Sequence, residues 1–121
     1  MTVTVTNQSN PLGSRLVQDT NCSNTAIDNT TGTSGNLYAV EITNPNGVAV
    51  YFKMADAVSA TAGTTAADMV FMCPASATKN IVFIAGINFG SGFSHWCVTS
   101  ALEANTDAPV SAVTVRYVTD A

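Results

Sequence analysis

Hydrophobic and polar residues alternate along much of the chain with a period of two. Residues 2–6 alternate threonine with valine, and residues 112–118 place Val113, Val115 and Tyr117 on one side of an extended chain. Successive side chains of a strand point to opposite faces of a sheet, so this pattern is typical of antiparallel strands with one buried face. Valine and threonine also favour strands, because branched side chains suit a pleated surface.

The middle of the chain contains further predicted strands. They span residues 36–43, 48–55, 68–73, 79–85 and 93–100, with weaker candidates at 15–19 and 23–27. In 93–100, His95 and Cys97 share one face and Trp96 lies on the other. Asn46 and Gly47 separate two of the ranges, and such a pair favours the positive φ angles of a tight hairpin. The total of seven to nine short strands predicts an all-β fold, an antiparallel β-sandwich of jelly-roll type.

Two segments depart from this pattern. Residues 55–67 are rich in alanine but lack a large apolar stripe at helical spacing, so we expect a long loop there. Residues 1–35 are rich in Ser, Thr and Asn and contain few large apolar side chains. We therefore divide the chain into a polar N-terminal arm or pair of edge strands at 1–35 and a β-sandwich domain at 36–121.

Composition narrows the classes of function. The chain has 121 residues, of which 10% are charged and 38 are Ser, Thr or Asn. Its net charge is −4, and its four basic residues are scattered, whereas nucleic-acid binding needs clustered cations. No apolar stretch reaches the ~18 residues of a membrane helix. No secretory signal follows Met1, so we expect a reducing compartment and free, buried thiols at Cys22, Cys73 and Cys97. The alternative is one disulfide with one remaining thiol.

The sequence offers little chemistry for catalysis. His95 is the one histidine, and a lone histidine in a strand is more often packed or hydrogen-bonded than catalytic. With Cys97 it would form only half a metal site. The glycine-rich run 86–92 leads into a strand rather than a helix, so we interpret it as a turn and not as a phosphate-binding loop. We predict no enzyme activity, no catalytic or metal-binding residues, no cofactor and no small-molecule substrate.

Three aromatic residues support one alternative function. Trp96, Tyr38 and Tyr51 are candidates for stacking on the rings of a glycan. The competing interpretation is that these rings fill the core and its rim.

Residues 37–118 contain a recognisable series of short motifs. They are the strand 37–42, the Lys-x-x-Asp unit from Lys53 to Asp56, the Gly-Thr-Thr unit at 63–65, a strand closing on Pro-Ala at 74–75, and the Gly-Ile-x-Phe-x-x-Gly segment at 86–92. In these motifs the chain resembles a small β-sandwich domain of tailed-bacteriophage particles. In that pattern a proline follows Gly-Thr-Thr, whereas this chain continues with 66–68, Ala-Ala-Asp. Residues 1–35 lie outside the resemblance.

The resemblance implies a virion structural protein. We expect a capsid decoration, or cement, protein on the capsid surface, made in the host cytoplasm. Its partners would be the major capsid protein and copies of itself, with a homotrimer suspected, and neither nucleic acid nor membrane. The alternative is a tail or fibre component that binds a host-surface glycan through Trp96, Tyr38 or Tyr51.

Overall fold

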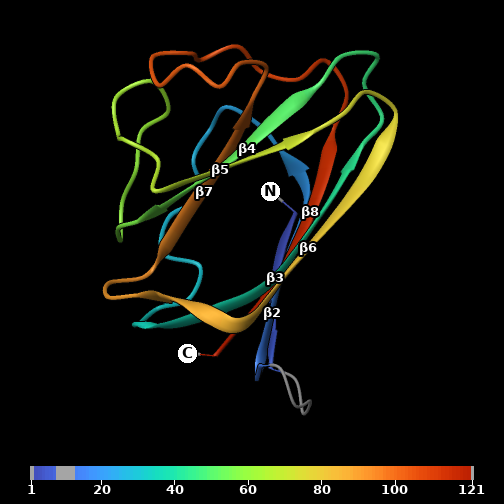
Figure 1. Ribbon diagram of the computed structural model, residues 1–121. Helices are drawn as coiled ribbons and strands as arrows, with labels where there is room; N and C mark the ends of the chain where they lie inside the picture. Colours follow the sequence, from blue (N-terminus) through green and yellow to red (C-terminus); the bar gives the residue numbers. More distant parts are fainter. Residues whose placement is uncertain (1, 8–12, 121) are drawn as a thin grey trace.

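Two antiparallel β-sheets pack face to face in the protein, as Figure 1 shows. The computed structural model describes residues 2–7 and 13–120, which contain eight strands. In chain order these are β1 (Val3–Asn7), β2 (Arg15–Cys22), β3 (Gly35–Asn44), β4 (Val50–Asp56), β5 (Met69–Cys73), β6 (Ala77–Phe89), β7 (Phe93–Val98) and β8 (Val113–Asp120). No helix in these residues is long and apolar enough to cross a membrane.

The large sheet has the strand order β1-β2-β8-β3-β6, and the small sheet has the order β5-β4-β7. The sequence-based prediction of an all-β sandwich with seven to nine strands is therefore confirmed, while the jelly-roll type stays a prediction. The predicted loop at 55–67 is confirmed from residue 57 onward, whereas residues 55 and 56 still belong to β4.

The core lies between the inner faces of the two sheets. On β8 the alternate residues Val113, Val115 and Tyr117 are at most 1% exposed, as the alternation predicted. Phe52 and Met54 of β4 face them from the small sheet and are completely buried. Each fully buried side chain of this size contributes roughly 1.5–3 kcal/mol of hydrophobic stabilisation, so this interface holds the sheets together.

The N-terminal segment takes part in the same sheet and core. β1 is the edge strand of the large sheet, and β2 lies between β1 and β8. Val17 and Cys22 of β2 are at most 2% exposed and belong to the main core cluster. Residues 8–12, part of the segment expected as an arm, lie outside the described residues.

The predicted hairpin at Asn46 and Gly47 is wrong. β3 pairs with β6 and β8, so both of its edges are occupied, and the chain crosses to the small sheet to begin β4. Neither Asn46 nor Gly47 has a positive φ angle. Instead, the Asn44 side chain organises the crossing: its Oδ1 accepts the Asn46 N–H at 2.9 Å, and its Nδ2 donates to the Val48 and Pro74 carbonyls at 2.9 Å. The side chains of this segment therefore shape the turn, but they do not determine which strands pair.

The free edge of β7 is covered by the chain between β2 and β3. The Ile27 N–H donates to the His95 carbonyl at 2.9 Å, and the His95 N–H donates to the Ile27 carbonyl at 3.0 Å. The Cys97 N–H donates to the Ser23 carbonyl at 2.8 Å. Residues 23–27, a weak strand candidate, do not form a strand, and their one β-bridge is the contact between Ile27 and His95. The contact fixes the backbone of His95 from both sides, since β4 pairs with the other edge of β7.

Candidate functional site: a buried polar cluster

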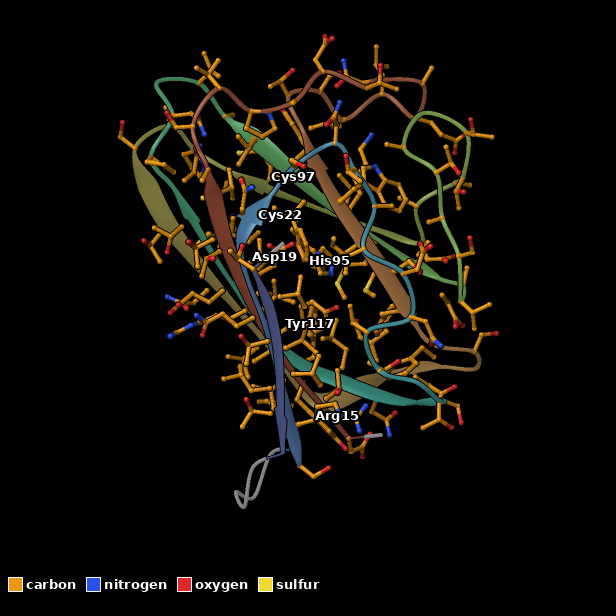
Figure 2. All side chains as sticks on the ribbon, turned by 180° about the vertical axis from the view of Figure 1, so that it is seen from behind. Arg15, Asp19, Cys22, His95, Cys97 and Tyr117 are labelled. Carbon is orange, nitrogen blue, oxygen red and sulfur yellow. The ribbon has the colours of Figure 1, made fainter. Side chains whose placement is uncertain are left out.

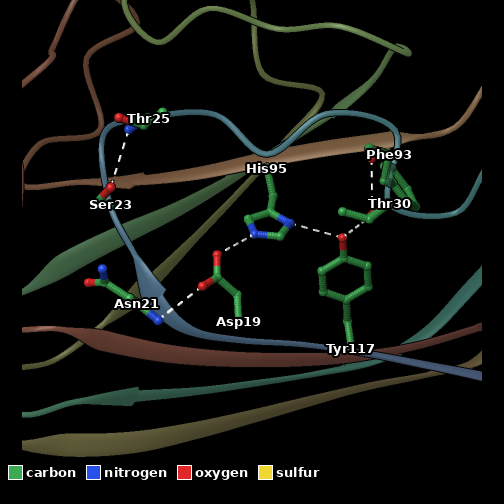
Figure 3. Close-up of polar contacts among 8 residues, drawn as sticks. All are labelled: Asp19, Asn21, Ser23, Thr25, Thr30, Phe93, His95 and Tyr117. Atoms are coloured by element: carbon green, nitrogen blue, oxygen red, sulfur yellow. Dashed lines mark hydrogen bonds and ion pairs between the residues drawn. The ribbon is translucent and has the colours of Figure 1, made fainter. Parts of the chain in front are cut away.

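A cluster of polar side chains interrupts the apolar core between the two sheets (Figure 2). We call Asp19, His95, Tyr117 and Thr30 the polar cluster. Asp19 lies on β2, Tyr117 on β8 and His95 on β7, so both sheets contribute. His95 Nε2 is 2.9 Å from Asp19 Oδ2, and His95 Nδ1 is 2.9 Å from the Tyr117 hydroxyl (Figure 3).

A bulge in β2 determines which residues reach the cluster. Asp19 pairs with Val115 of β8 and Cys22 pairs with Val113, so β2 carries one residue more than β8 over this stretch. In a regular strand, residues three apart point to opposite faces. The additional residue brings Asp19 and Cys22 to the same, inner face of the sheet.

A chain of hydrogen bonds links the members of the cluster. The Thr30 hydroxyl can donate to the Phe93 carbonyl at 3.1 Å and also contacts the Tyr117 hydroxyl. The Tyr117 hydroxyl in turn lies 2.9 Å from His95 Nδ1. Both ring nitrogens of His95 are therefore engaged inside the cluster, Nδ1 by Tyr117 and Nε2 by Asp19.

The whole cluster is enclosed. Asp19 and His95 are completely buried, Tyr117 is 1% exposed and Thr30 is 8% exposed. Burial raises the pKa of the Tyr117 hydroxyl far above its ordinary value, and the hydrogen bond with Thr30 lowers it only in part. Tyr117 therefore stays protonated and remains a hydrogen-bond donor. The remaining carboxylate oxygen of Asp19, Oδ1, accepts the Asn21 N–H at 3.0 Å.

Two thiols adjoin the polar cluster. Cys22 and Cys97 are free cysteines, and all three cysteines are buried, as the sequence predicted. Burial raises the pKa of the Cys22 thiol well above its ordinary value, and the neighbouring Cys97 side chain and the Asp19 charge raise it further. Cys22 is therefore a protonated thiol in the absence of a cation. One ligand atom each from Asp19, Cys22 and His95 lie within 4.8 Å of one another.

The geometry limits what this arrangement can do chemically. An Asp–His pair next to a hydroxyl has the parts of an acid–base relay. However, a general base must touch the proton that it removes from a substrate, and these side chains are closed off from solvent. The cluster is suited to stabilising the fold or to holding an ion, since the donor atoms of Asp19, Cys22 and His95 are of the types that bind divalent metals.

The residues predicted for glycan stacking are not brought together. Trp96 is 1% exposed and packs under the alanine-rich loop, so neither face of its ring is available to a sugar. Tyr51 is partly exposed on β4 in the small sheet. Tyr38 is partly exposed on β3 in the large sheet, and its hydroxyl donates to Asp120 Oδ2 at 2.8 Å. The three rings therefore do not form one platform.

A small cavity lies on the outer side of the small sheet. It has a volume of about 80 Å³ and is lined by Lys53, Trp96 and Glu103, among others. Lys53 is 1% exposed, and its Nζ donates to the Leu102 carbonyl at 2.7 Å. Trp96 Nε1 has no hydrogen-bond partner among the described protein groups. Ligand pockets usually measure roughly 300–1,000 Å³, so this cavity is too small for anything but water or a small ion.

The comparisons with known proteins leave the family open. No protein-family model matches the chain, and neither curated proteins nor solved structures give a significant match. The assignment of a role therefore depends on the residues themselves and on their arrangement.

Sequence reasoning identified His95 and Cys97 but missed their partners. It treated His95 as a packed or hydrogen-bonded side chain, and both of its ring nitrogens are hydrogen-bonded. Asp19 lies 76 positions away in a weakly predicted strand, and the bulge that orients Cys22 has no signature in the sequence. The one available signal was local composition. Asp19 and Cys22 lie within four positions of each other, in a stretch that otherwise consists mostly of Ser, Thr and Asn.

Proposed function

We propose that the protein is a virion structural protein, a capsid decoration protein that stabilises a phage head through protein–protein contacts. The proposal rests on the resemblance of residues 37–118 to particle domains and on one structural observation. That observation is an exposed apolar row on the outer face of the large sheet. A decoration protein works by burying such surface against copies of itself and against the shell.

The apolar row crosses four neighbouring strands. Leu16 of β2 pairs with Val118 of β8, Val118 pairs with Ala39 of β3, and Ala39 pairs with Val82 of β6. These residues line a groove on the outer face, and Val82 is 59% exposed. Outward positions of an antiparallel sheet are usually polar, so an in-register apolar row there is informative.

A row of polar side chains lies beside the apolar row and gives the groove specificity for a partner. Arg116 Nε donates to Gln18 Oε1 at 3.1 Å, and Arg116 Nη1 lies 3.9 Å from Glu41 Oε1. An apolar stripe next to charged and amide groups has the composition of a protein interface, with an apolar centre and a polar rim.

The row ends at an exposed edge strand. Between Val82 and Ile87, β6 advances five residues while β3 advances two, from Ala39 to Leu37. The bulge presents Ile84, which is 90% exposed. Edge strands with exposed apolar residues invite pairing with another chain, which suits an oligomer such as the suspected homotrimer. A standard contact needs about 800 Å² from each partner, a minor part of the 5635 Å² that this chain exposes.

The surface proposal is tested with paired variants. Val82→Asp and Ile84→Asp place a charge in the proposed interface, whereas Val110→Asp changes an equally apolar residue, 97% exposed, in the loop before β8. Sedimentation velocity should show an oligomer for the wild type and for Val110→Asp, and a shift towards monomer for the other two. A monomeric wild type, or equal behaviour of all variants, would count against this surface.

The location on the particle needs a second experiment. Immunogold labelling of intact phage particles, with antibody against the purified chain, should distribute gold evenly over the head. Gold confined to the tail or fibres would instead favour a glycan-binding component, for which only the partly exposed Tyr38 and Tyr51 remain as platforms. Unlabelled particles would refute a virion role.

A further inference from the structure

We propose that Asp19, Cys22 and His95 bind a divalent transition metal ion of the zinc type inside the sandwich. We call these three residues the ligand set. This inference is independent of the proposed function, because it concerns the core and not the outer surface.

Two opposed strands supply the ligand set. Asp19 and Cys22 come from β2 of the large sheet and are turned to the same face by the bulge between them. His95 comes from β7 of the small sheet, and its ring reaches Asp19 across the core. All three are at most 2% exposed, and the buried Cys97 thiol interacts with the Cys22 side chain. An ion at this point would join the two sheets directly.

The spacing of the donor atoms is close to what zinc requires. Zinc binds Cys sulfur, His nitrogen and carboxylate oxygen at about 2.0–2.3 Å, so tetrahedral ligand atoms lie about 3.3–3.8 Å apart. In the protein, His95 Nε2 and Asp19 Oδ2 are 2.9 Å apart. The ligand atoms of Asp19, Cys22 and His95 are all within 4.8 Å of one another. Shifts of about 1 Å or less would bring the three into zinc geometry.

The contact between Asp19 and His95 leaves a place for a cation. His95 Nε2 and Asp19 Oδ2 are 2.9 Å apart, and each is an atom that binds metal ions. A proton or a metal ion must lie between them, because two facing lone pairs repel. A proton satisfies this one contact, whereas a divalent ion also engages the sulfur of Cys22.

The surroundings of His95 fit a metal ligand in two further respects. Metal-binding histidines usually donate their other ring N–H to a fixed acceptor, and here the Tyr117 hydroxyl lies 2.9 Å from Nδ1, where its oxygen can accept that proton. Charge also balances: a divalent ion bound by the Asp19 carboxylate, a Cys22 thiolate and neutral His95 is electrically neutral, which suits an apolar core. On binding, the Cys22 thiol proton leaves to solvent.

The test supplies zinc to the full chain during refolding, because the proposed site is closed to solvent in the folded protein. The chain is unfolded and reduced, refolded with Zn²⁺ or with EDTA, dialysed, and analysed for zinc per chain and for its urea midpoint. We expect one zinc per chain and a higher midpoint in zinc, since an ion that binds only the folded state stabilises it. Refolding with Co²⁺ should give thiolate-to-cobalt charge-transfer absorption and the visible bands of tetrahedral cobalt.

Variants separate this site from adventitious binding. Cys22→Ala removes a ligand, and Asp19→Asn weakens one while keeping the hydrogen bonds, so each should lower zinc affinity by roughly tenfold or more. Cys73→Ala removes a buried thiol outside the ligand set and should bind zinc like the wild type. A wild type without retained zinc, a cobalt form without thiolate absorption, or equal loss in Cys73→Ala and Cys22→Ala would each overturn the proposal.

Discussion

The two faces of the small sheet bury polar side chains in different ways. On the inner face of β7, His95 uses both ring nitrogens, with Asp19 and Tyr117 each at 2.9 Å. On the outer face, Lys53 and Trp96 are paired across β4 and β7 and are each 1% exposed. Yet the Trp96 Nε1 has no partner among the described protein groups, and one hydrogen bond to Leu102 holds the Lys53 ammonium.

The difference follows from what covers each face. The inner face meets another sheet, whose register fixes where every side chain points. The outer face is covered by loops, at 57–67 and 99–112, whose exposed residues include Leu102 at 73% and Val58 at 55%. A rigid partner can satisfy buried polar groups completely, while a loop with few buried contacts satisfies them only partly and opens more easily. The comparison predicts four differences between the faces, from large to small.

The largest effect should come from His95→Phe. The substitution keeps an aromatic ring in the core but leaves the Asp19 carboxylate buried without its partner, which costs about 3–5 kcal/mol. Urea unfolding in EDTA measures the loss. Asp19→Asn is the control, because its uncharged amide keeps hydrogen-bonding atoms beside Asn21 and His95, so its cost should be about 1 kcal/mol. Equal destabilisation by both variants would contradict the view that His95 stabilises a buried Asp19 charge.

Tyr117→Phe should have the second largest effect. Loss of the hydroxyl leaves His95 Nδ1 buried without its hydrogen-bond partner, which costs about 1–3 kcal/mol. The same unfolding experiment gives the value. If Tyr117→Phe were as stable as the wild type, the hydrogen-bond chain through Thr30 would have no part in holding the sheets.

Lys53→Met should change the pH dependence more than the stability at neutral pH. Burial lowers the pKa of Lys53, while Glu103 opposes the shift. Between its folded pKa and the unfolded value of about 10.4, the unfolded chain binds more protons, so this group makes stability rise with pH. The burial penalty is present below the folded pKa and disappears above the unfolded one. Lys53→Met should remove that rise and shift stability at pH 7 by about 1 kcal/mol or less.

The prediction for Lys53 is tested by comparing how the stability of the wild type and of Lys53→Met changes with pH. Urea midpoints of the wild type and of Lys53→Met are compared from neutral pH to about pH 10.4, the unfolded lysine pKa. The other titrating groups are common to both proteins and cancel in the difference. Parallel curves would show that the loop at 99–112 leaves the ammonium solvated.

The smallest effect should come from Trp96→Phe. The variant loses buried apolar area, which destabilises the fold, but it also removes a buried N–H without a partner, which stabilises it. Each of these two effects is worth about 1–3 kcal/mol. We expect a net change of roughly 1 kcal/mol or less, below that of Tyr117→Phe, although tryptophan is the larger side chain. A loss greater than that of Tyr117→Phe would mean that the outer face is packed as firmly as the inner one.

The sequence by itself determined most of the strands and the buried face of β8. It was wrong at residues 23–27, which form only a bridge, and at residues 86–89, which were expected in a turn and belong to β6. Alternation placed Val113, Val115 and Tyr117 together on the inner face, because side-chain direction in a strand follows from position alone. Whether a segment forms a strand or a loop depends largely on its own residues, so the loop that follows β4 could also be predicted from the sequence.

The tertiary structure decided pairing, register and the polar cluster. Asn46 and Gly47 favour a hairpin locally, but β3 already had β6 and β8 as neighbours, and so the chain crossed to the other sheet. Asp19 met His95 only because β2 and β7 lie opposite each other in different sheets. Contacts between residues far apart in the chain depend on how whole sheets pack, and no local pattern of residues encodes them.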